Sequence, residues 1–451
     1  MLIAWNAISN DDLIRISIMH INDTHGQLAP KDKGGIARIG TLIKEARVDN
    51  NNVLVLHAGD EFSRGDDLTS YYYGQVNMLA LQAAGFDAFT PGNGDFYFGV
   101  KNLLNQTSLV KFPTLLANVF YKKDEKRIFK PYVVKEIGDV KIAILGLGFI
   151  RLEHPSGWGL ELQDPVKAAK EFVPELRRKA DLVVALTHIG LGDDQRLAKE
   201  VPQIDIIIGG HSHNKLNKPL RIKRTNGNGE VIIAQAGEYG EFLGQLDIDL
   251  SSNGTGGYRM VKAEGRLIPV EKSIKEDAEI VKLLKTYTNA LSEVVCISKV
   301  SLPNPESGDS PMGSFAAESI RTQTGTSISV LSRSAIQGEI KKGKVTAANI
   351  SQIHPWHNRI LRIKLTGKHL QDVLAKNDVF AAGVSFTKAN GKARISNIKS
   401  SSFNADGIYT VALDDYLYSL DESLHNISFE DTGETVDSAL TKHLKQTMSS
   451  P

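Results

Sequence analysis

Short apolar runs alternate with stretches of helical pattern between Leu13 and about Pro269, which predicts a layered α/β domain. Most of these runs are continuously apolar, as expected for strands that are buried on both faces. The predicted strands are Ile14–His20, Val53–His57, Ala88–Thr90, Val140–Leu147, Leu182–Leu186, Ile204–Gly209, Val231–Gln235 and Leu243–Leu250. The glycine- and serine-rich segment Ser251–Gly257 is typical of a turn or surface loop.

A single apolar stripe follows this domain, between about Lys272 and Val295. Its members recur at three- and four-residue steps, which predicts one long helix. They are Ile274, Val281, Leu284, Leu291 and Val294. The pattern fits a rigid linker between two domains and equally the first core helix of a second domain.

From Leu302 onward the pattern of apolar and polar residues changes. Pro303–Gly308 is a loop by composition, Gly313–Thr322 is predicted to be a helix, and strands and helices then alternate through Val411–Leu417. The residues from Ser419 are polar, and we expect the last of them to be loosely held. The predicted boundaries are 13–270 for the first domain, 271–298 for a linker helix, 299–425 for a smaller α/β domain and 426–451 for a polar tail.

Composition is that of an ordinary soluble globular protein, with 41% hydrophobic and 23% charged residues, and 451 residues indicate two or three domains. The net charge of +1 provides no general attraction to nucleic acid polymers or anionic membranes, and no apolar run approaches the roughly 18 residues of a membrane span. The single cysteine, Cys296, excludes an intramolecular disulfide. Residues Met1–Asp12 lack the features of a signal peptide, so we expect a cytosolic protein or one whose signal was removed.

Side chains that bind metals stand directly after five of the predicted strands. They are Asp23 and His25 in the segment His20–Gly26, Asp60 in Ala58–Asp60, Asn93 in Pro91–Asn93, His188, and His211 and His213 in Gly209–His213. Because loops at the carboxyl ends of strands converge on one crevice, these seven side chains can meet. Each motif alone is common in turns, but their joint occurrence favours a metal site.

We predict two divalent cations at this site, with Asp60 shared between them. One cation is enclosed by Asp23, His25, Asp60 and His213, and the other by Asp60, Asn93, His188 and His211. Two cations about 3.5–4 Å apart would activate a bridging water and hold the oxygens of an in-line displacement. The predicted catalytic residues are Asp60, Asn93 and Arg38.

These residues resemble the calcineurin-type metallophosphoesterase superfamily, and within it the bacterial 5′-nucleotidase and UDP-sugar hydrolase family. The segment His20–Gly26 is similar to the family's opening motif, Gly34–Arg38 to its second motif, and Pro355–Asn358 to its Pro-Phe-x-Asn motif. Gly308–Arg321 and Lys344–Leu374 look like its C-terminal substrate domain, so the resemblance covers nearly the whole chain.

The resemblance implies a four-layer α-β-β-α metal domain joined by a linker helix to a smaller α/β specificity domain that closes by rotation about the helix. It also implies two Zn²⁺ or Mn²⁺ ions, a small, nucleotide-like phosphorylated substrate, and a periplasmic or cell-surface location. His20 and Asn22 would orient the ligands rather than bind metal, and Arg38 would help to organise the cleft. No pattern indicates an oligomeric state.

The chain departs from the family at two places. Gly94 and Tyr97 replace the His and Asp of the usual catalytic dyad, which assists the departing oxygen, a contribution of about 10²–10⁴ in rate. The family's Asn-x-Gly-Gly-Ile-Arg segment appears as Ser332–Gln337, in which Arg333 could supply the charge from a shifted position. The candidate aromatic contacts to a substrate ring are Trp356, Phe380 and Tyr416.

Three hypotheses follow. The first is a metal-dependent hydrolase of phosphate esters or anhydrides, with a nucleotide-like substrate whose leaving group needs little protonation. The second keeps the fold but cleaves a sulfur-linked conjugate, as a related hydrolase of bacterial thiosulfate oxidation does; that hydrolase also lacks the dyad. The third is a catalytically weak binding protein that retains metal as a structural staple.

Overall fold

The computed structural model describes residues 13–448, except 30–31, 63–64, 226, 228, 255 and 400. The chain divides into two compact units: the first runs to Thr286 apart from residues 153–155, and the second comprises residues 153–155 and those from Tyr287 onward. Both units mix helices with sheets, which confirms the predicted two-domain α/β fold class. Within the described residues, none of the helices combines the length and apolar character that crossing a membrane requires.

The first unit contains two large sheets. The first has the strand order β13 (Tyr258–Pro269), β12 (Phe242–Ser252), β1 (Leu13–Ile21), β2 (Val53–His57) and β3 (Ala88–Phe89). The second has the order β10 (Leu220–Lys223), β11 (Glu230–Ala234), β9 (Ile206–Ile208), β8 (Leu182–Thr187), β6 (Val140–Leu147) and β5 (Tyr132–Ile137). β1, β2 and β3 run parallel, as do β6, β8, β9 and β11, so in each sheet the carboxyl ends of these strands lie on one side.

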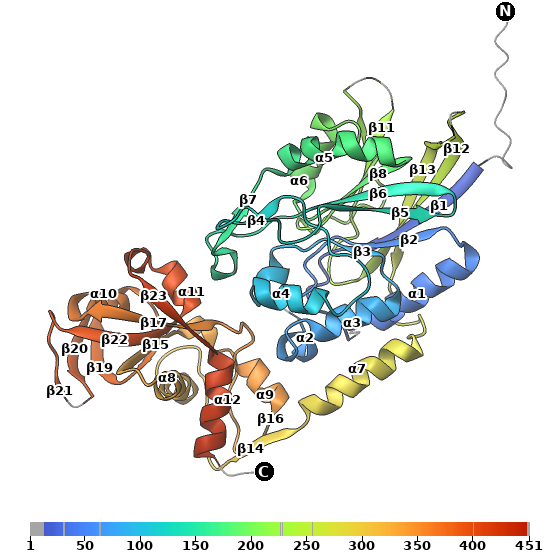
Figure 1. Ribbon diagram of the computed structural model, residues 1–451. Helices are drawn as coiled ribbons and strands as arrows, with labels where there is room; N and C mark the ends of the chain where they lie inside the picture. Colours follow the sequence, from blue (N-terminus) through green and yellow to red (C-terminus); the bar gives the residue numbers. More distant parts are fainter. Residues whose placement is uncertain are drawn as a thin grey trace, which may run out of the picture. The chain divides into compact units, whose positions relative to one another are not determined.

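The two sheets pack face to face through one apolar core. Ile16, Ile18 and Leu54 of the first sheet join Ile142 and Val184 of the second in this cluster of buried residues. The helices α5 (Pro165–Lys179) and α6 (Leu191–Glu200) cover the second sheet, and α1 (Ile36–Asp49) and α3 (Gln75–Ala84) cover the first (Figure 1). This is the four-layer α-β-β-α arrangement that the resemblance implies.

Shorter elements complete this unit. They are α2 (Asp67–Tyr71), the 3-10 helix η2 (Gly94–Phe96), α4 (Val100–Thr107), β4 (Val119–Tyr121), the 3-10 helix η3 (Pro155–Gly157), whose first residue belongs to the second unit, and β7 (Leu160–Leu162). Among the longer strands, β5, β10 and β13 have no counterpart in the prediction. All three lie at sheet edges and mix half-buried with exposed residues, so they lack the continuous apolar run on which the prediction relied.

The predicted linker helix is shorter than expected. α7 spans Ala278–Leu291, and the Asp277 carboxylate accepts the backbone amides of Glu279 and Ile280 at its start. The last residues of the predicted segment instead form β14 (Val294–Ser298), which pairs antiparallel with β16 (Gly343–Thr346). Valine is a good strand former, and a partner strand from later in the chain decided its conformation here.

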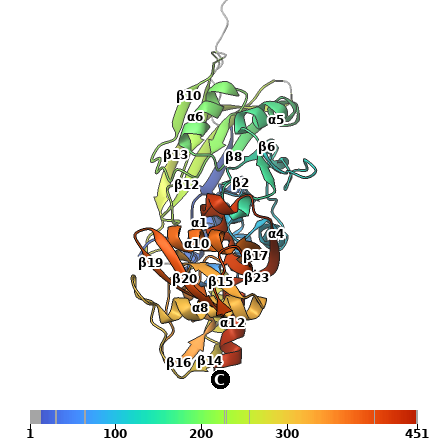
Figure 2. The same cartoon turned by 90° about the vertical axis from the view of Figure 1, so that its left-hand side faces the viewer.

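The second unit is built around a five-stranded sheet. Its strand order is β18 (Val379–Ala382), β15 (Ile328–Ser332), β22 (Ile408–Asp414), β17 (Arg359–Thr366) and β23 (Phe429–Thr435). A separate sheet contains β19 (Val384–Ala389), β20 (Lys392–Ile398) and β21 (Ser401–Ser402), with β20 against α10 (Figure 2). The helices are α8 (Pro311–Thr324), η4 (Arg333–Ala335), α9 (Ala347–Ile353), α10 (Gly367–Lys376), α11 (Asp415–Leu420), η5 (Glu422–Leu424) and α12 (Val436–Thr447).

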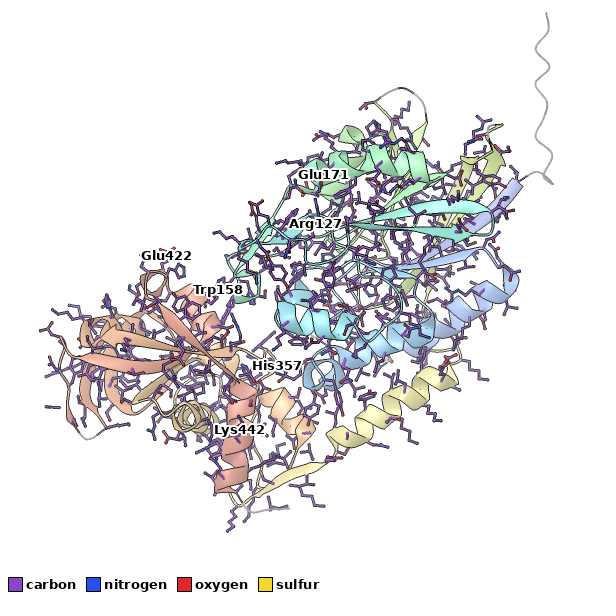
Figure 3. The ribbon with its side chains drawn as sticks, in the orientation of Figure 1. Arg127, Trp158, Glu171, His357, Glu422 and Lys442 are labelled. Carbon is purple, nitrogen blue, oxygen red and sulfur yellow. The ribbon has the colours of Figure 1, made fainter. Side chains whose placement is uncertain are left out.

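The prediction of a polar tail over residues 426–451 is wrong for the part that the structure describes. β23 is a strand of the main sheet, and α12 buries Val436, Leu440 and Leu444 in the core of the second unit. The ring of His357, labelled in Figure 3, lies 3.1 Å from the Asp437 carboxylate on the first turn of this helix. The apolar positions of α12 are separated by polar residues, which concealed the stripe; residues 449–451 lie outside the described part.

Candidate metal centre

The loops after β1 and β2 are joined to each other by backbone hydrogen bonds. The amide of Asp23 donates to the Gly59 carbonyl at 2.8 Å, and the amide of His25 donates to the Asp60 carbonyl at 2.9 Å. Because β1 and β2 are parallel neighbours, both loops leave the sheet at the same edge. This arrangement brings the Asp23, His25 and Asp60 side chains into one cluster.

Five of the seven predicted ligands have a left-handed backbone. Their φ angles are 52° at Asp23, 49° at His25, 55° at Asp60, 77° at His211 and 55° at His213. Such a conformation costs roughly 1–3 kcal/mol in a residue other than glycine and persists only when its surroundings impose it. Its concentration in this cluster indicates that the loops are shaped for the side chains they present.

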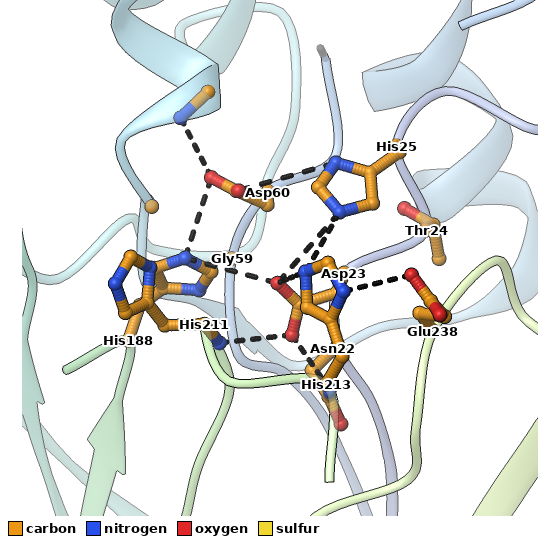
Figure 4. A network of polar contacts seen from close by, with 12 residues as sticks. Asn22, Asp23, Thr24, His25, Gly59, Asp60, His188, His211, His213 and Glu238 are labelled. Carbon is orange, nitrogen blue, oxygen red and sulfur yellow. Dashed lines mark hydrogen bonds and ion pairs between the residues drawn. The ribbon is translucent and has the colours of Figure 1, made fainter. Parts of the chain in front are cut away.

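One group of ligand atoms comes from Asp23, His25 and His213, all within 4.8 Å of one another (Figure 4). Nε2 of His213 lies 3.3 Å from Oδ1 of Asp23 and 3.1 Å from Nε2 of His25. Two nitrogens bound to one zinc ion at about 2.0–2.1 Å are roughly 3 Å apart. The spacing therefore suits a single cation.

A second group comes from Asp23, Asp60 and His188. Nε2 of His188 lies 3.4 Å from Oδ1 of Asp60, while Oδ2 of Asp60 lies 3.9 Å from Nδ1 of His25. Asp60 thus places Oδ1 in the second group and Oδ2 near the His25 ring, on the side of Nδ1 and not of the Nε2 atom that lies next to His213. Oδ1 of Asp23 is also common to the two groups, a feature that the prediction lacked.

Three acceptor atoms of the cluster are buried without a hydrogen-bond partner among the described residues: Oδ1 of Asp23, Oδ1 of Asn93 and Nε2 of His188. In each of these three side chains the other polar atom makes a hydrogen bond. Oδ2 of Asp23 accepts from the His211 amide at 2.9 Å, and Nδ1 of His188 donates to the Ala58 carbonyl at 2.7 Å. Buried acceptors are normally paired, so these residues fit a bound cation.

The remaining two predicted ligands border this cluster. The His211 ring lies 5.2 Å from that of His188, and its other neighbour is Phe149 at 5.0 Å. Asn93 follows Gly92, where a Cβ atom would stand 2.3 Å from Oδ1 of Asp60 and 2.4 Å from Nε2 of His188. Only glycine allows the backbone to pass so close to the ligand atoms.

The cluster has a strongly negative character. Burial lowers the pKa of His188, but the Asp60 and Asp23 carboxylates outweigh it and raise that pKa to about 10. Burial likewise raises the pKa of Asp60, yet the nearby His188 imidazole brings it far below the usual range. The two carboxylates therefore demand a positive charge, which a proton on His188 or a metal cation can provide.

Three residues that support the ligands were not among the predicted site residues. The Asp95 carboxylate accepts the backbone amides of Asp60, Glu61, Phe62 and Gly92 at 2.8–2.9 Å, so it ties the Asp60 loop to the Asn93 loop. Glu238 lies 2.7 Å from Nδ1 of His213, and Tyr97 contacts Asn93. Glu238 follows β11, a parallel neighbour of β9, so the strand-end rule that identified His211 also applied to it.

Asn22 and Arg38 lie beside the cluster. Asn22 donates to Oδ2 of Asp23 at 2.7 Å and accepts from the Ala236 amide, so it orients a ligand as the resemblance implies. Arg38 is buried on α1 and donates to the Gly34 carbonyl at 3.2 Å. Gly34 packs on the Tyr239 carbonyl, and the amide of Tyr239 donates to Asp23. Arg38 is thus linked to Asp23 through Gly34 and Tyr239, and among the described residues it makes no hydrogen bond to the cluster itself.

The four predicted substrate contacts all lie in the second unit. Phe380 is buried at 6% exposure in the core, which contradicts its prediction as an open stacking surface, and the Arg333 guanidinium lies over its ring at 4.4 Å. Arg333 also donates to Asp378 and to the Gly308 carbonyl. Trp356 is 41% exposed after α9, and Tyr416 is half-buried on α11.

Two family models match the chain, each over a different part. The model described as calcineurin-like phosphoesterase matches residues 16–215, which include all seven predicted ligands. The model described as 5′-nucleotidase, C-terminal domain matches residues 273–424.

Two relatives match most of the chain at low identity. The chain is 28% identical over 432 residues to the trifunctional nucleotide phosphoesterase protein YfkN of Bacillus subtilis, covering 84% of this chain and 29% of that protein. The chain therefore spans less than a third of that relative. It is 26% identical over 457 residues to a 5′-nucleotidase of Vibrio vulnificus, covering 86% of this chain and 81% of that protein.

Solved structures share the fold over almost the whole chain. A 5′-nucleotidase precursor of Thermus thermophilus superposes with a TM-score of 0.60 and 22% identity, covering 97% of each chain. The sulfate thiohydrolase SoxB of the same organism superposes with a TM-score of 0.58 and 16% identity, covering 96% of this chain and 94% of that one. At these identities the likeness describes the fold alone.

Proposed function

Because the chain belongs to the 5′-nucleotidase family of calcineurin-like phosphoesterases, we propose that it hydrolyses phosphate esters or anhydrides of nucleotide-like compounds at a two-metal centre. The observation that carries this proposal is the convergence of buried acceptor atoms without partners, Oδ1 of Asp23, Oδ1 of Asn93 and Nε2 of His188. Such a set is costly to bury unless a cation satisfies it.

The seven ligands divide into two sets. Asp23, His25 and His213 would hold one ion, Asn93, His188 and His211 would hold the other, and Asp60 would be a ligand of both. When bound, two divalent cations, Zn²⁺ or Mn²⁺, polarise a phosphoryl oxygen and lower the pKa of a water molecule. The protein's own contribution is to fix these donors before substrate arrives: Ala58 sets the His188 tautomer, and the Gly94 amide donates to Oδ1 of Asp60 at 2.7 Å.

The leaving group narrows the substrate class. Gly94 has no side chain that could give a proton to the departing oxygen, and that assistance is worth about 10²–10⁴ in rate. An alkoxide depends on it most, whereas a nucleotide or an aryl oxide departs without it. We therefore propose anhydrides and activated diesters as better substrates than simple 5′-monophosphates.

The second unit supplies the contacts to the substrate ring in this proposal. Trp356 presents an exposed indole and Tyr416 a half-buried phenol, and both can stack on a planar base. Arg333 and Phe380 are left out of these contacts, because Phe380 is buried and the Arg333 guanidinium lies over its ring and donates to Asp378 and to the Gly308 carbonyl.

The test combines metal content with turnover. Purified protein loaded with Mn²⁺ or Zn²⁺ is assayed on bis(p-nitrophenyl) phosphate and p-nitrophenyl phosphate, alongside Asp60→Ala and the control Asp372→Ala, an exposed aspartate of α10. We expect chelator-sensitive hydrolysis, faster on the diester, that Asp60→Ala lowers by roughly 10³-fold and Asp372→Ala leaves unchanged. A protein that binds metal but turns over neither ester would support the binding-protein hypothesis instead.

A separate assay tests the hypothesis that the protein cleaves a sulfur conjugate. The likeness to the sulfate thiohydrolase concerns the fold alone, so it does not favour that chemistry. A sulfur-conjugated thiol is offered under the same conditions as the phosphodiester. Preferential cleavage of the thiol conjugate would overturn the phosphoesterase proposal while leaving the metal centre intact.

A further inference from the structure

We propose that Tyr97 is a positioning residue whose hydroxyl holds the Asn93 amide with Oδ1 toward the metal centre. This inference rests on the proposed function, since it concerns how one of the proposed ligands is oriented. Tyr97 stands where the resemblance places the acidic member of the catalytic dyad, so the position has exchanged one role for another.

The contact itself is direct. Nδ2 of Asn93 lies 3.2 Å from the Tyr97 hydroxyl, while Oδ1 of the same amide is buried without a hydrogen-bond partner among the described residues. In the Asn93 amide, Nδ2 is thus bonded to Tyr97, and Oδ1 is available to a ligand. The open end belongs to the residue that follows Gly92, whose backbone passes next to Asp60 and His188.

The chemistry of an amide explains why the held end matters. When a cation takes Oδ1, Nδ2 lies on the other branch of the amide, and in a buried position its N–H groups need an acceptor. The Tyr97 hydroxyl oxygen is such an acceptor. Without it, a buried N–H is left unsatisfied in the metal-bound orientation, which penalises that orientation against all others.

The local backbone makes Tyr97 suitable for this task. Asn93 and Tyr97 flank the 3-10 helix η2, and the 3.2 Å contact between Nδ2 and the hydroxyl joins their side chains across this turn. The turn is anchored on its other side, because Phe96 is 1% exposed and the Asp95 carboxylate accepts the amides of Gly92 and Asp60. The phenol therefore rests on a fixed platform and can hold the Asn93 amide at a set distance.

The variant Tyr97→Phe removes the hydroxyl and keeps the ring. Tyr258→Phe is the matched control, since Tyr258 is half-buried against the core between the sheets and lies on β13. The affinities for the two Mn²⁺ ions are measured by calorimetry on the full chain, with thermal unfolding of the metal-free protein as a check on folding. We expect Tyr97→Phe to lower the affinity for one Mn²⁺ ion by about 10–100-fold and the affinity for the other by less than about threefold.

A second measurement separates positioning from packing. In an Asn93→Ala background the hydroxyl has no amide to hold, so adding Tyr97→Phe should change the affinity of the remaining ion by less than about twofold. Turnover by the single variant should recover as Mn²⁺ is raised, because the hydroxyl acts through the metal. Both results support the assignment.

Contrary results are distinct from failure of the proposed function. If the wild-type protein binds two ions and Tyr97→Phe binds both as tightly, the role of Tyr97 is refuted and the metal centre stands. Equal weakening of both ions, or the same loss in Tyr258→Phe, would reduce Tyr97 to a packing residue. If the wild-type protein binds no ion, the proposed function fails and this inference fails with it.

Discussion

Two regions of the chain are rich in buried polar side chains, and they use them differently. In the first unit, Asp23, Asn93 and His188 each keep one buried atom without a hydrogen-bond partner, and Asp23 and His188 belong to a common cluster. In the second unit, Asp414 accepts from the amides of Ser332 and Leu417 and from Asn358, and His354 is held by the Ala335 carbonyl and the Asn358 amide. The first arrangement needs a ligand, whereas the second is complete in itself.

This comparison teaches how to separate binding sites from structural networks. Residue types alone place histidines and aspartates in both regions. The difference lies in the atoms left over after the protein has satisfied its own hydrogen bonds. Backbone strain follows the same division, since Asp23, His25 and Asp60 are left-handed, whereas φ is −74° at Asp414 and −135° at His354.

The largest effects on stability and on metal affinity are expected from substitutions of Asp95 and Asp414. Both are buried carboxylates that accept backbone amides, so Asp95→Asn and Asp414→Asn replace one acceptor oxygen with a donor in each region. Each should lower the free energy of unfolding by about 2–3 kcal/mol. Only Asp95→Asn should also lower Mn²⁺ affinity, by roughly 100-fold, which calorimetry measures; equal metal affinity in both variants would refute the contrast.

A smaller effect is expected at Glu238. Its carboxylate accepts from Nδ1 of His213, which leaves Nε2 for the metal. Glu238→Gln weakens this support and should reduce the affinity of one Mn²⁺ ion by about 10–100-fold with little change in folding. The neighbouring Glu241→Gln serves as the control. Unchanged affinity in Glu238→Gln would show that His213 needs no such partner.

These predictions also mark what the sequence could and could not provide. The seven candidate ligands could be predicted because parallel strands end at one edge, a rule that depends only on strand order. Asp95 and Tyr97 were missed because their partners are backbone amides and one side-chain amide, which no spacing of residue types encodes. The same limit hid β23 and α12, whose pairing and burial depend on elements distant in the chain.

Asp415 should make the stability of the second unit depend on pH. Burial raises the pKa of Asp415 to about 7, although Arg359 opposes the shift. A raised pKa means that the folded protein binds more protons than the unfolded chain between about pH 4 and 7, so stability falls as the pH rises through this window. The slope should be on the order of 1 kcal/mol per pH unit and flatten in Asp415→Asn. Urea unfolding at several pH values measures it, and equal slopes in both proteins would contradict the assignment.

The smallest effect is expected from Arg333. Nε and Nη2 of its guanidinium donate to Asp378 and to the Gly308 carbonyl, and Nη1 is buried without a hydrogen-bond partner among the described residues. Because the group is held over the Phe380 ring, Arg333→Ala should change KM for the diester by less than about threefold. Trp356→Ala removes an exposed ring and should raise KM about tenfold with kcat nearly constant. Steady-state kinetics on both variants decides between them. A larger increase of KM in Arg333→Ala would show that Arg333 contacts the substrate.

Anomalous scattering from crystals grown with Mn²⁺ tests the central claim most directly. The account predicts two peaks in the first unit, one among Asp23, His25 and His213 and one among Asn93, His188 and His211, with Asp60 contacting both. Crystals that show no peak within reach of these side chains, or a peak bound only elsewhere on the chain, would contradict it.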